Sequence, residues 1–399
     1  MRVGYLSTHS PADPGAISGV PHAAWNALAG AGIDLVDLSA ASARPMGNPA
    51  NPSRGARNPA RHAAHWVRGI GRWLTLRGQY GQTLAKVEAR SRRAQARLDA
   101  APPLDLVFSV CISSLLYTIR TDLPVVYASD TTGHLMNTTY PEYRARSEEY
   151  HRAADEIERT CLHKCRFFAP SSQPTARSAV EHYGMPPERV RVIEFGANVT
   201  PDDMPIDPAP PTRDHLELVL VAADPQRKRL DLCIEVAKEL RARGWNAVLN
   251  FIGPRPSSRE EDGVVDWAGP LQLSDPDDRQ QHKEILRRSH WMLLPSTAEA
   301  FGIAPCEAAH FGRPSVVTDV GGLPTVVQHE RTGMVVPVDA PASVYADAIE
   351  RFSDDPARYE AMSQAALQRA RDTLNWSVWA KRMKALFEEA VAGAGIYSA

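Results

Sequence analysis

The 399-residue sequence has little of what marks several classes of protein. Aromatic residues make up only 7%, and no run of about 18 apolar residues occurs, so no membrane-spanning helix is predicted. Its 45 Lys and Arg nearly balance its 47 Asp and Glu, and the formal net charge of −2 gives no general reason to expect nucleic acid as a partner. The opening run, MRVGYLST, is too short for a signal peptide and predicts a first strand.

Cysteine is scarce and scattered. The five cysteines are Cys111, Cys161, Cys165, Cys233 and Cys306. An odd, dispersed set predicts no disulfide framework and indicates the reducing cytoplasm. No cluster of Cys or His has metal-ligand spacing, and the acid-x-acid pattern of Asp275 and Asp277 opens a predicted helix, where acids cap the first amides. We therefore predict no metal site.

The sequence does contain a regular alternation of short apolar runs and segments with helical periodicity. The runs are rich in Val, Leu and Ile and do not alternate with polar residues, as expected for strands buried on both faces of a parallel sheet. The predicted strands are Val3–Leu6, Leu35–Leu38, Leu106–Val110, Val125–Tyr127, Phe167–Ala169 and Val190–Ile193, then Leu216–Ala222, Ala247–Ile252, Val264–Trp267, Trp291–Leu294, Ser315–Thr318 and Met334–Val336. The alternation predicts the α/β class.

A proline-rich segment separates the two sets of strands. It reads PDDMPIDPAPPTRD, residues 201–214, and its five prolines predict a stiff, extended connector. We predict two doubly wound, Rossmann-like domains that face each other across a cleft, with about six strands each. The first spans residues 1–200, the second spans 215–375, and a C-terminal helix within 376–399 packs back on the first.

A basic helical insertion is predicted at about residues 52–100. Between Arg54 and Arg97 there are eleven Lys or Arg and one acid, Glu88. Two interpretations stay open. The segment is a solvated helical insertion whose apolar stripe joins the first domain, or it lies on an anionic membrane surface or binds an anionic acceptor.

The stretch from Leu294 to Pro337 carries the clearest chemistry. A strand ends at Leu294, Glu299 lies in the following loop, and a helix begins near Ile303 and carries Glu307. Ligands of open α/β sheets bind at this edge, and the amides around Gly302 form an anion site at the first helical turn. The two acids suit sugar and ribose hydroxyls, since carboxylates accept hydrogen bonds. A phosphate between two such acids indicates a nucleotide sugar.

This stretch has the pattern P-S-x2-E-x-F-G-x4-E-A-x3-G-x-P, followed by G-G-x-P and T-G. The pattern resembles the retaining glycosyltransferases of family 4, which have the GT-B fold. The resemblance implies that Glu299 binds the transferred sugar and Glu307 the ribose. It also implies that the backbone of Phe301, Gly302 and Ile303 holds sugar and phosphate, and that the Gly321-Gly322 turn shapes the same pocket.

A second constellation follows the strand at Leu216–Ala222. Arg227 and Lys228 lie in a strand-to-helix loop, where cations neutralise a diphosphate. Lys228 matches the family's lysine, whereas Ala222 and Ala223 stand where the family has an early arginine, and Arg229 replaces its glycine. Arg227 is therefore the candidate for the missing guanidinium.

The first domain has weaker signals. Ser18-Gly19 follows the first strand at the position where the family often has Gly-Gly, next to the donor. Where the family often places a histidine after the fourth strand, this chain has Ser129-Asp130, so Asp130 is the candidate, with His134 as the alternative. His22 is predicted to have a packing or capping role.

The resemblance implies a retaining glycosyltransferase that needs no cofactor or metal ion besides its nucleotide-diphosphate sugar. We expect a small-molecule or glycan acceptor, phosphorylated or lipid-linked, and a cytoplasmic protein, with peripheral membrane contact through residues 54–97 as the open alternative. Two other functions remain: another GT-B enzyme, such as a nucleotide-sugar epimerase or a phosphorylase, and a non-catalytic sugar-nucleotide-binding or scaffold subunit. The scaffold alternative stays open because this chain lacks the family's histidine and early arginine.

Overall fold

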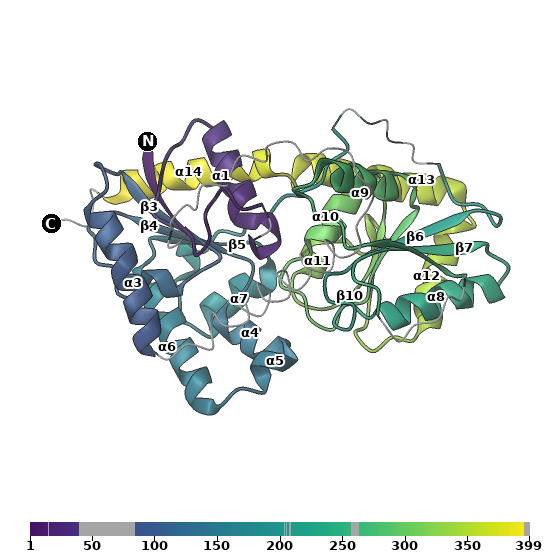
Figure 1. Cartoon of the computed structure of the whole chain (residues 1–399), viewed down its shortest axis with the longest axis horizontal. Helices are drawn as coiled ribbons and strands as arrows, with labels where there is room; N and C mark the ends of the chain where they lie inside the picture. The colour runs from purple at the N-terminus through teal and green to yellow at the C-terminus, as the bar shows by residue number, and fades with distance from the viewer. Residues whose placement is uncertain are drawn as a thin grey trace, which may run out of the picture.

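The computed structural model describes residues 1–14, 16–39, 84–202, 204, 206, 209–256 and 263–394. Two lobes lie side by side, each built on a parallel sheet with helices on both faces (Figure 1). The predicted class, α/β with two doubly wound domains, is confirmed. Among the described helices, none is long and apolar enough to cross a membrane.

The N-terminal domain has the strand order β2-β1-β3-β4-β5, and every pairing is parallel. Every residue of β3, β4 and β5 is buried, as the unbroken apolar runs predict. The strands are β1 (Arg2–Leu6), β2 (Asp34–Asp37), β3 (Leu106–Val110), β4 (Val125–Ser129) and β5 (Phe167–Pro170). The described α-helices are α1 (Val20–Gly30), α3 (Leu84–Asp99), α4 (Gly133–Thr139), α5 (Pro141–Arg144), α6 (Glu148–Lys164) and α7 (Gln173–Glu181).

The C-terminal domain has the strand order β11-β10-β9-β6-β7-β8, again all parallel. Its strands are β6 (Leu216–Val221), β7 (Ala247–Ile252), β8 (Val265–Gly269), β9 (Trp291–Leu294), β10 (Ser315–Thr318) and β11 (Gly333–Val336). The helices are α8 (Leu230–Ala242), α9 (Pro276–Arg288), α10 (Ile303–His310), α11 (Leu323–Val326), α12 (Ala342–Ser353) and α13 (Pro356–Asp372). The stripe Leu230, Ile234, Val236, Ala237 and Leu240 buries α8 against the sheet.

One predicted strand, Val190–Ile193, is wrong. The segment forms a single bridge from Val190 to Phe168, so the described part of the first domain has five strands rather than about six. The amides of Arg191 and Ile193 donate to Phe168 O and Pro170 O, both at 2.9 Å. Between these two bonds a parallel ladder needs a third, from the amide of Pro170, and proline has none, so only the single bridge forms.

The last helix, α14 (Trp376–Ala394), returns to the N-terminal domain and runs beside α1 (Figure 1). Its Phe387 and Trp379 rings lie 5.1 and 6.3 Å from the ring of Phe108 on β3. At the start of α14, Trp376 Nε1 donates to Asn198 Oδ1 at 3.0 Å. The chain thus crosses between the domains twice, which ties their orientation at a second point.

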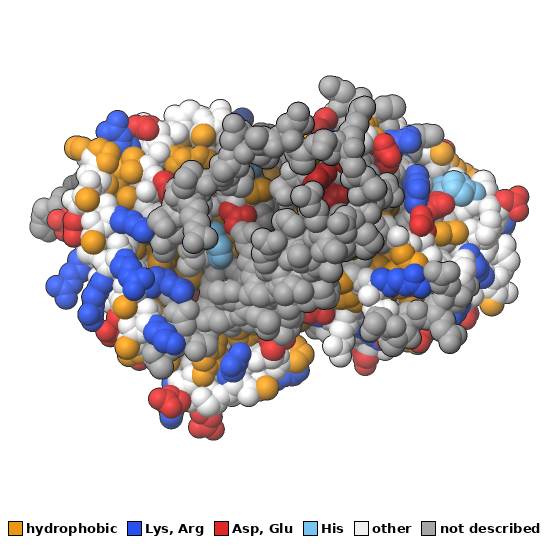
Figure 2. Space-filling view, in the orientation of Figure 1, with side chains coloured by type: hydrophobic (Ala, Val, Ile, Leu, Met, Phe, Trp, Pro, Cys, Tyr) orange, Lys and Arg blue, Asp and Glu red, His pale blue; other side chains and the backbone are white. Residues whose placement is uncertain are grey.

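Residues 54–83 of the basic segment lie outside the described residues, and its remainder forms α3. Val87 and Ala94 of α3 are buried in the core of the first domain, whereas Lys86, Arg92 and Arg93 are exposed. Lys and Arg side chains gather on the face that carries α3 (Figure 2). In this part the apolar stripe packs inward and the cationic side faces solvent.

Candidate active site

The sheet order of the C-terminal domain brings three loops together. Strands β10, β9 and β6 are neighbours and parallel, so the loops after their carboxyl ends share one edge. The amide of Thr297, after β9, donates to Arg227 O, after β6, at 3.0 Å. The Asp224 side chain shapes the β6 loop by accepting from the amide of Arg227 at 3.1 Å. Local turn chemistry and sheet topology together position the predicted residues.

Glu299 lies between the predicted cations. Its Oε2 is 3.2 Å from Arg227 Nη1 and 3.8 Å from Lys228 Nζ, and it accepts from Ser296 Oγ at 3.4 Å. Burial by itself would raise the pKa of Glu299, but Arg227 and Lys228 outweigh it, and the pKa is lowered. The side chain is therefore a carboxylate at neutral pH, ready to accept hydrogen bonds.

Of the three consecutive cations, Arg227 and Lys228 contact the Glu299 loop or its neighbouring strand, whereas Arg229 contacts a different segment. Arg227 also donates to Ala298 O, and Lys228 Nζ donates to Val221 O at 3.2 Å, so both hold the loops together. Burial lowers the pKa of Lys228, against the opposing effect of Glu299. Arg229 has a left-handed backbone, φ 51°, and its Nη1 donates to Val338 O at 2.8 Å. Only Arg227 and Lys228 join the cluster.

Glu307 also acts electrostatically on Lys228. The side chain lies on α10, is 5% exposed, and influences the charge of Lys228, as Glu299 does. Its Oε2 is 3.6 Å from Nε2 of His282 on α9, a histidine that sequence analysis did not select. Both predicted acids therefore act electrostatically on one lysine, and His282 is the described ionic partner of Glu307.

The Gly321-Gly322 turn packs directly against the backbone of the Glu299 loop. A Cβ at Gly321 would lie 1.6 Å from Glu299 O, and one at Gly322 would lie 2.5 Å from Ala300 O. Gly321 also has φ +52°. Because any side chain would collide with the loop backbone, this turn fixes where Glu299 lies.

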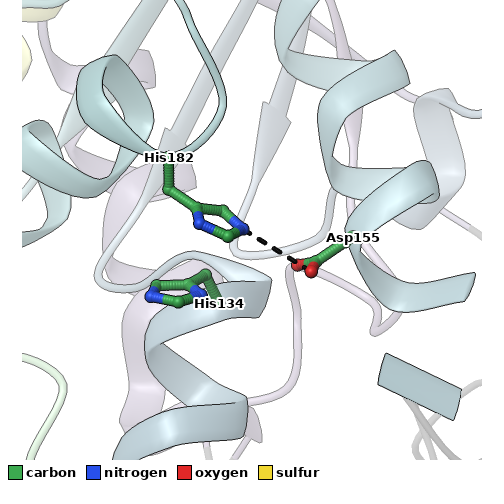
Figure 3. A group of neighbouring side chains, drawn as sticks. All are labelled: His134, Asp155 and His182. Carbon is green, nitrogen blue, oxygen red and sulfur yellow. Dashed lines mark ion pairs between the residues drawn. The ribbon is translucent and has the colours of Figure 1, made fainter. Parts of the chain in front are cut away.

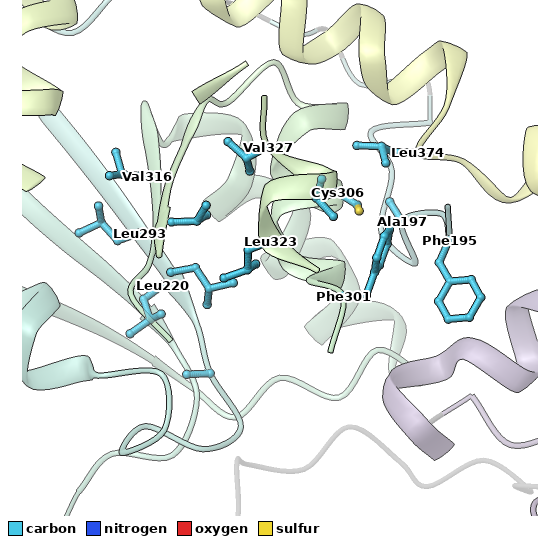
Figure 4. Close-up of a cluster of buried hydrophobic side chains, with 14 of the residues drawn as sticks. Phe195, Ala197, Leu220, Leu293, Phe301, Cys306, Val316, Leu323, Val327 and Leu374 are labelled. Carbon is cyan, nitrogen blue, oxygen red and sulfur yellow. The ribbon is translucent and has the colours of Figure 1, made fainter. Parts of the chain in front are cut away.

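Phe301, Gly302 and Ile303 form the start of α10. Gly302 has φ +111° and caps the helix, and a Cβ there would lie 2.7 Å from Leu323 Cδ2. The ring of Phe301 is buried, 5.7 Å from the ring of Phe195 (Figure 4). The side chain thus belongs to the core between the domains, and only the backbone of these residues is suited to hold an anion, as predicted for them.

The N-terminal domain supplies an opposing wall. Asp130 follows β4, and burial together with Glu299 raises its pKa to about 6. Tyr140, which sequence analysis missed, lies with its ring 5.8 Å from the guanidinium carbon of Arg227. The Tyr140 pKa is raised by burial and by Glu299. No motif marks Tyr140, which lies between α4 and α5 and meets Arg227 only in the folded chain.

His134 lies elsewhere. It is the second residue of α4, and its ring stacks on His182, with 3.7 Å between ring centroids. Burial lowers its pKa, and His182 adds to this effect. Of the two candidates after β4, the structure places Asp130, and not His134, within electrostatic reach of Glu299.

Ser18 and Gly19 meet the domain junction rather than the Glu299 cluster. Ser18 O accepts from Asn198 Nδ2, and a Cβ at Gly19 would lie 2.9 Å from the same Nδ2. Gly19 lines a separate cavity of about 830 Å³ together with Trp376. The contacts described for Ser18 and Gly19 are therefore with Asn198 and not with the Glu299 cluster, and their predicted contact with the donor stays a prediction. His22 bonds Pro11 O at 2.6 Å and Asn26 at 3.0 Å, the packing role predicted for it.

The matching family model is "Glycosyl transferases group 1", and it covers residues 212–369. A D-inositol 3-phosphate glycosyltransferase of Corynebacterium efficiens is 26% identical over 67% of this chain and 66% of its own length. One from Catenulispora acidiphila is 31% identical over 53% and 54%. The alignments with these curated relatives thus span between about half and two thirds of their length.

Solved structures match nearly the whole chain. The sucrose-phosphate synthase of Thermosynechococcus elongatus aligns with a TM-score of 0.65 at 17% identity, covering 98% of this chain and 99% of that one. A glycosyltransferase of Rickettsia africae gives 0.59 at 13% identity, with 98% of both chains covered. At such identities the likeness shows the fold. The chain therefore has the GT-B fold predicted from its sequence, and the group 1 glycosyl transferase model matches its C-terminal domain.

Proposed function

We propose that this chain is a retaining glycosyltransferase that transfers a sugar from a nucleotide-diphosphate sugar to a phosphorylated acceptor. The observation that carries the proposal is the partly buried Arg227–Glu299–Lys228 cluster at the carboxyl edge of the domain that the group 1 model matches. Two cations after β6 and a hydroxyl-accepting acid in the loop before α10 match the two parts of such a donor, its diphosphate and its sugar.

The chemistry follows from where charge develops. Breaking the bond at the anomeric carbon leaves negative charge on the diphosphate. Lys228, Arg227 and the first amides of α10 stabilise that charge, and burial strengthens the effect because the local dielectric is low. Without donor, Glu299 forms ion pairs with both cations, and one positive charge stays uncompensated within the group of three. When the diphosphate pairs with the two cations, Glu299 is free to accept hydrogen bonds from the sugar hydroxyls. Glu307 accepts hydrogen bonds from the ribose hydroxyls.

The acceptor binds on the side of the N-terminal domain, where Asp130 accepts a hydroxyl hydrogen bond. Retention follows from attack on the same face, with the leaving phosphate oxygen taking the acceptor proton. A phosphorylated acceptor is supported by the names of the relatives, D-inositol 3-phosphate glycosyltransferases, and of the structural neighbour, a sucrose-phosphate synthase. The reaction uses no cofactor besides the donor.

A lipid-linked acceptor at the cytoplasmic face of a membrane is the finer version of this proposal. The exposed cations of α3 support it, because anionic lipid attracts such a surface.

Nucleotide release from a panel of nucleotide sugars, with and without phosphorylated acceptors, tests the proposal. Lys228→Ala should lower kcat/KM roughly a hundredfold with the best donor, the scale of one lost charge stabiliser. Arg229→Gly is the matched control, since this neighbouring cation points to Val338 O and glycine suits its left-handed backbone. Donor binding without any transfer or hydrolysis would favour the scaffold alternative, and a normal rate in Lys228→Ala would refute the assignment.

A further inference from the structure

Three side chains with metal-ligand chemistry converge in the N-terminal domain, outside the candidate active site. They are His134 on α4, Asp155 on α6 and His182, which directly follows α7 (Figure 3). One ligand atom from each lies within 4.8 Å of the other two. His182 Nε2 is 3.5 Å from Asp155 Oδ2 and makes no hydrogen bond, although the atom is buried.

The surrounding residues hold this group in place. Tyr183 OH donates to Asp155 Oδ1 at 2.7 Å and accepts from the amide of His134 at 2.7 Å. This leaves Asp155 Oδ2 directed to His182. Arg159, one turn after Asp155, donates to His182 O and Tyr183 O at 3.2 and 3.1 Å. The carboxylate of Asp155 is thus oriented by a second hydrogen bond, as is typical of metal ligands, and the backbones of both histidines are held in place.

We propose that His134, Asp155 and His182 bind one divalent transition-metal ion of the Zn²⁺ class. Two imidazoles and one carboxylate suit borderline metals and not Mg²⁺ or Ca²⁺, which prefer oxygen ligands. Tetrahedral zinc bonds of about 2.0–2.2 Å need ligand atoms about 3.4 Å apart, so rotation of the stacked rings toward Asp155 Oδ2 closes the site. Water takes the fourth position.

The ion would join α4 to α6 and α7. Helix α4 begins three residues after Asp130 and ends next to Tyr140, whose ring faces Arg227. Metal binding therefore stabilises the segment that forms the acceptor-side wall. The site is distinct from the proposed transfer reaction, because its ligands take no part in the Glu299 cluster.

The direct test is a titration of the full chain, purified without a histidine tag and treated with chelator, with Zn²⁺ alone. Isothermal calorimetry should show one ion bound per chain, and Zn²⁺ should raise the melting temperature. His182→Ala should weaken binding about a hundredfold. Tyr183→Phe, which keeps all three ligands but frees Asp155, should weaken it about tenfold.

The matched control is His215→Ala. His215 Nε2 also lies 3.5 Å from a carboxylate oxygen, that of Glu217, but in the C-terminal domain, and its removal should leave binding unchanged. Equal binding in wild type and His182→Ala, or no stoichiometric binding in wild type, would overturn the proposal.

If His182→Ala does not fold, the visible absorption spectrum of the wild-type protein with bound Co²⁺ tests the proposal instead. Tetrahedral coordination by nitrogen and oxygen gives intense visible absorption without a thiolate charge-transfer band. That spectrum supports the proposed ligands, whereas a thiolate band would place the metal on a cysteine and overturn the proposal.

Discussion

The two domains are both built on parallel sheets, but the pKa values of their partly or fully buried carboxyl groups are shifted in opposite directions. In the C-terminal domain, the partly buried Glu299 is paired with Arg227 and Lys228, and its pKa is lowered. In the N-terminal domain, burial raises the pKa of Asp130 to about 6 and that of Glu158 to about 7, and in each case a nearby carboxylate adds to the effect. In the proposed reaction, the acid beside the diphosphate stays charged because cations compensate it, whereas these two acids of the N-terminal domain titrate near neutral pH.

The domains also differ in how the chain builds them. The C-terminal cluster comes from loops after neighbouring strands, braced by backbone contacts. The polar clusters of the N-terminal domain come from helices that meet only on packing, such as α4, α6 and α7. Substitutions at the braced loop should therefore have the larger effects, and those at the helices should depend more on pH.

Gly321→Ala should have the largest effect. Its Cβ would lie 1.6 Å from Glu299 O, so the Glu299 loop must move and the left-handed backbone is strained as well. We expect the free energy of unfolding to fall by about 4 kcal/mol, together with loss of activity. Denaturant unfolding followed by circular dichroism measures this.

The control for Gly321→Ala is Gly244→Ala. Gly244 has φ +87°, but nothing lies within 4 Å of its added Cβ, so backbone strain of about 1–2 kcal/mol is the only cost. Similar losses in the two variants would mean that the collision with the loop contributes nothing, against the proposed role of the turn.

Glu158→Gln tests the uncompensated acid of the N-terminal domain. The pKa of Glu158 is raised to about 7 from an ordinary value of 4.5, mainly by burial. Between these pH values the folded state keeps a proton that the unfolded state has released. Stability therefore falls as the pH rises from about 4.5 to 7, by about 3 kcal/mol in total, and then stays level.

Glutamine cannot ionise, so Glu158→Gln should remove this fall and unfold at higher denaturant concentration than wild type at pH 8. Glu149→Gln, at an exposed site on the same helix, should change nothing. If the free energy of unfolding of wild type and of Glu158→Gln changed with pH in the same way, the Glu158 carboxyl would not be the cause of the fall in stability.

The sequence predicts most of the fold, and it selects the residues that cluster around Glu299, because both depend on local signals. Buried parallel strands appear as apolar runs, and Glu299, Lys228 and Gly321 follow such runs at fixed spacing. Tyr140 and His282 carry no such signal, since they reach the site only when helices pack. The ligands His134, Asp155 and His182 are too far apart in the chain for spacing to reveal them, and Val190–Ile193 fails because Pro170 cannot donate.

Asp130→Asn tests the acid that faces the donor cluster. If the carboxylate form accepts a hydroxyl hydrogen bond, kcat/KM should fall about tenfold per pH unit below its pKa of about 6. The asparagine variant should be about tenfold slower at pH 7.5 and lack this acid limb. Asp122→Asn, at an exposed site in the same domain, should keep the wild-type profile. A wild-type profile that stays flat through pH 6 would exclude the role.

The smallest effect is expected on the surface of α3. If its exposed cations contact anionic lipid, each contributes about 1 kcal/mol near the membrane, so Arg93→Ala should weaken binding about fivefold. Co-sedimentation with phosphatidylserine vesicles at low salt measures this, and added salt should reduce binding by screening. Arg371→Ala, on the C-terminal domain, should bind like wild type. Equal weakening by both variants would indicate attraction by overall charge and not a docking face, and the membrane would then have no part in the contrast between the domains.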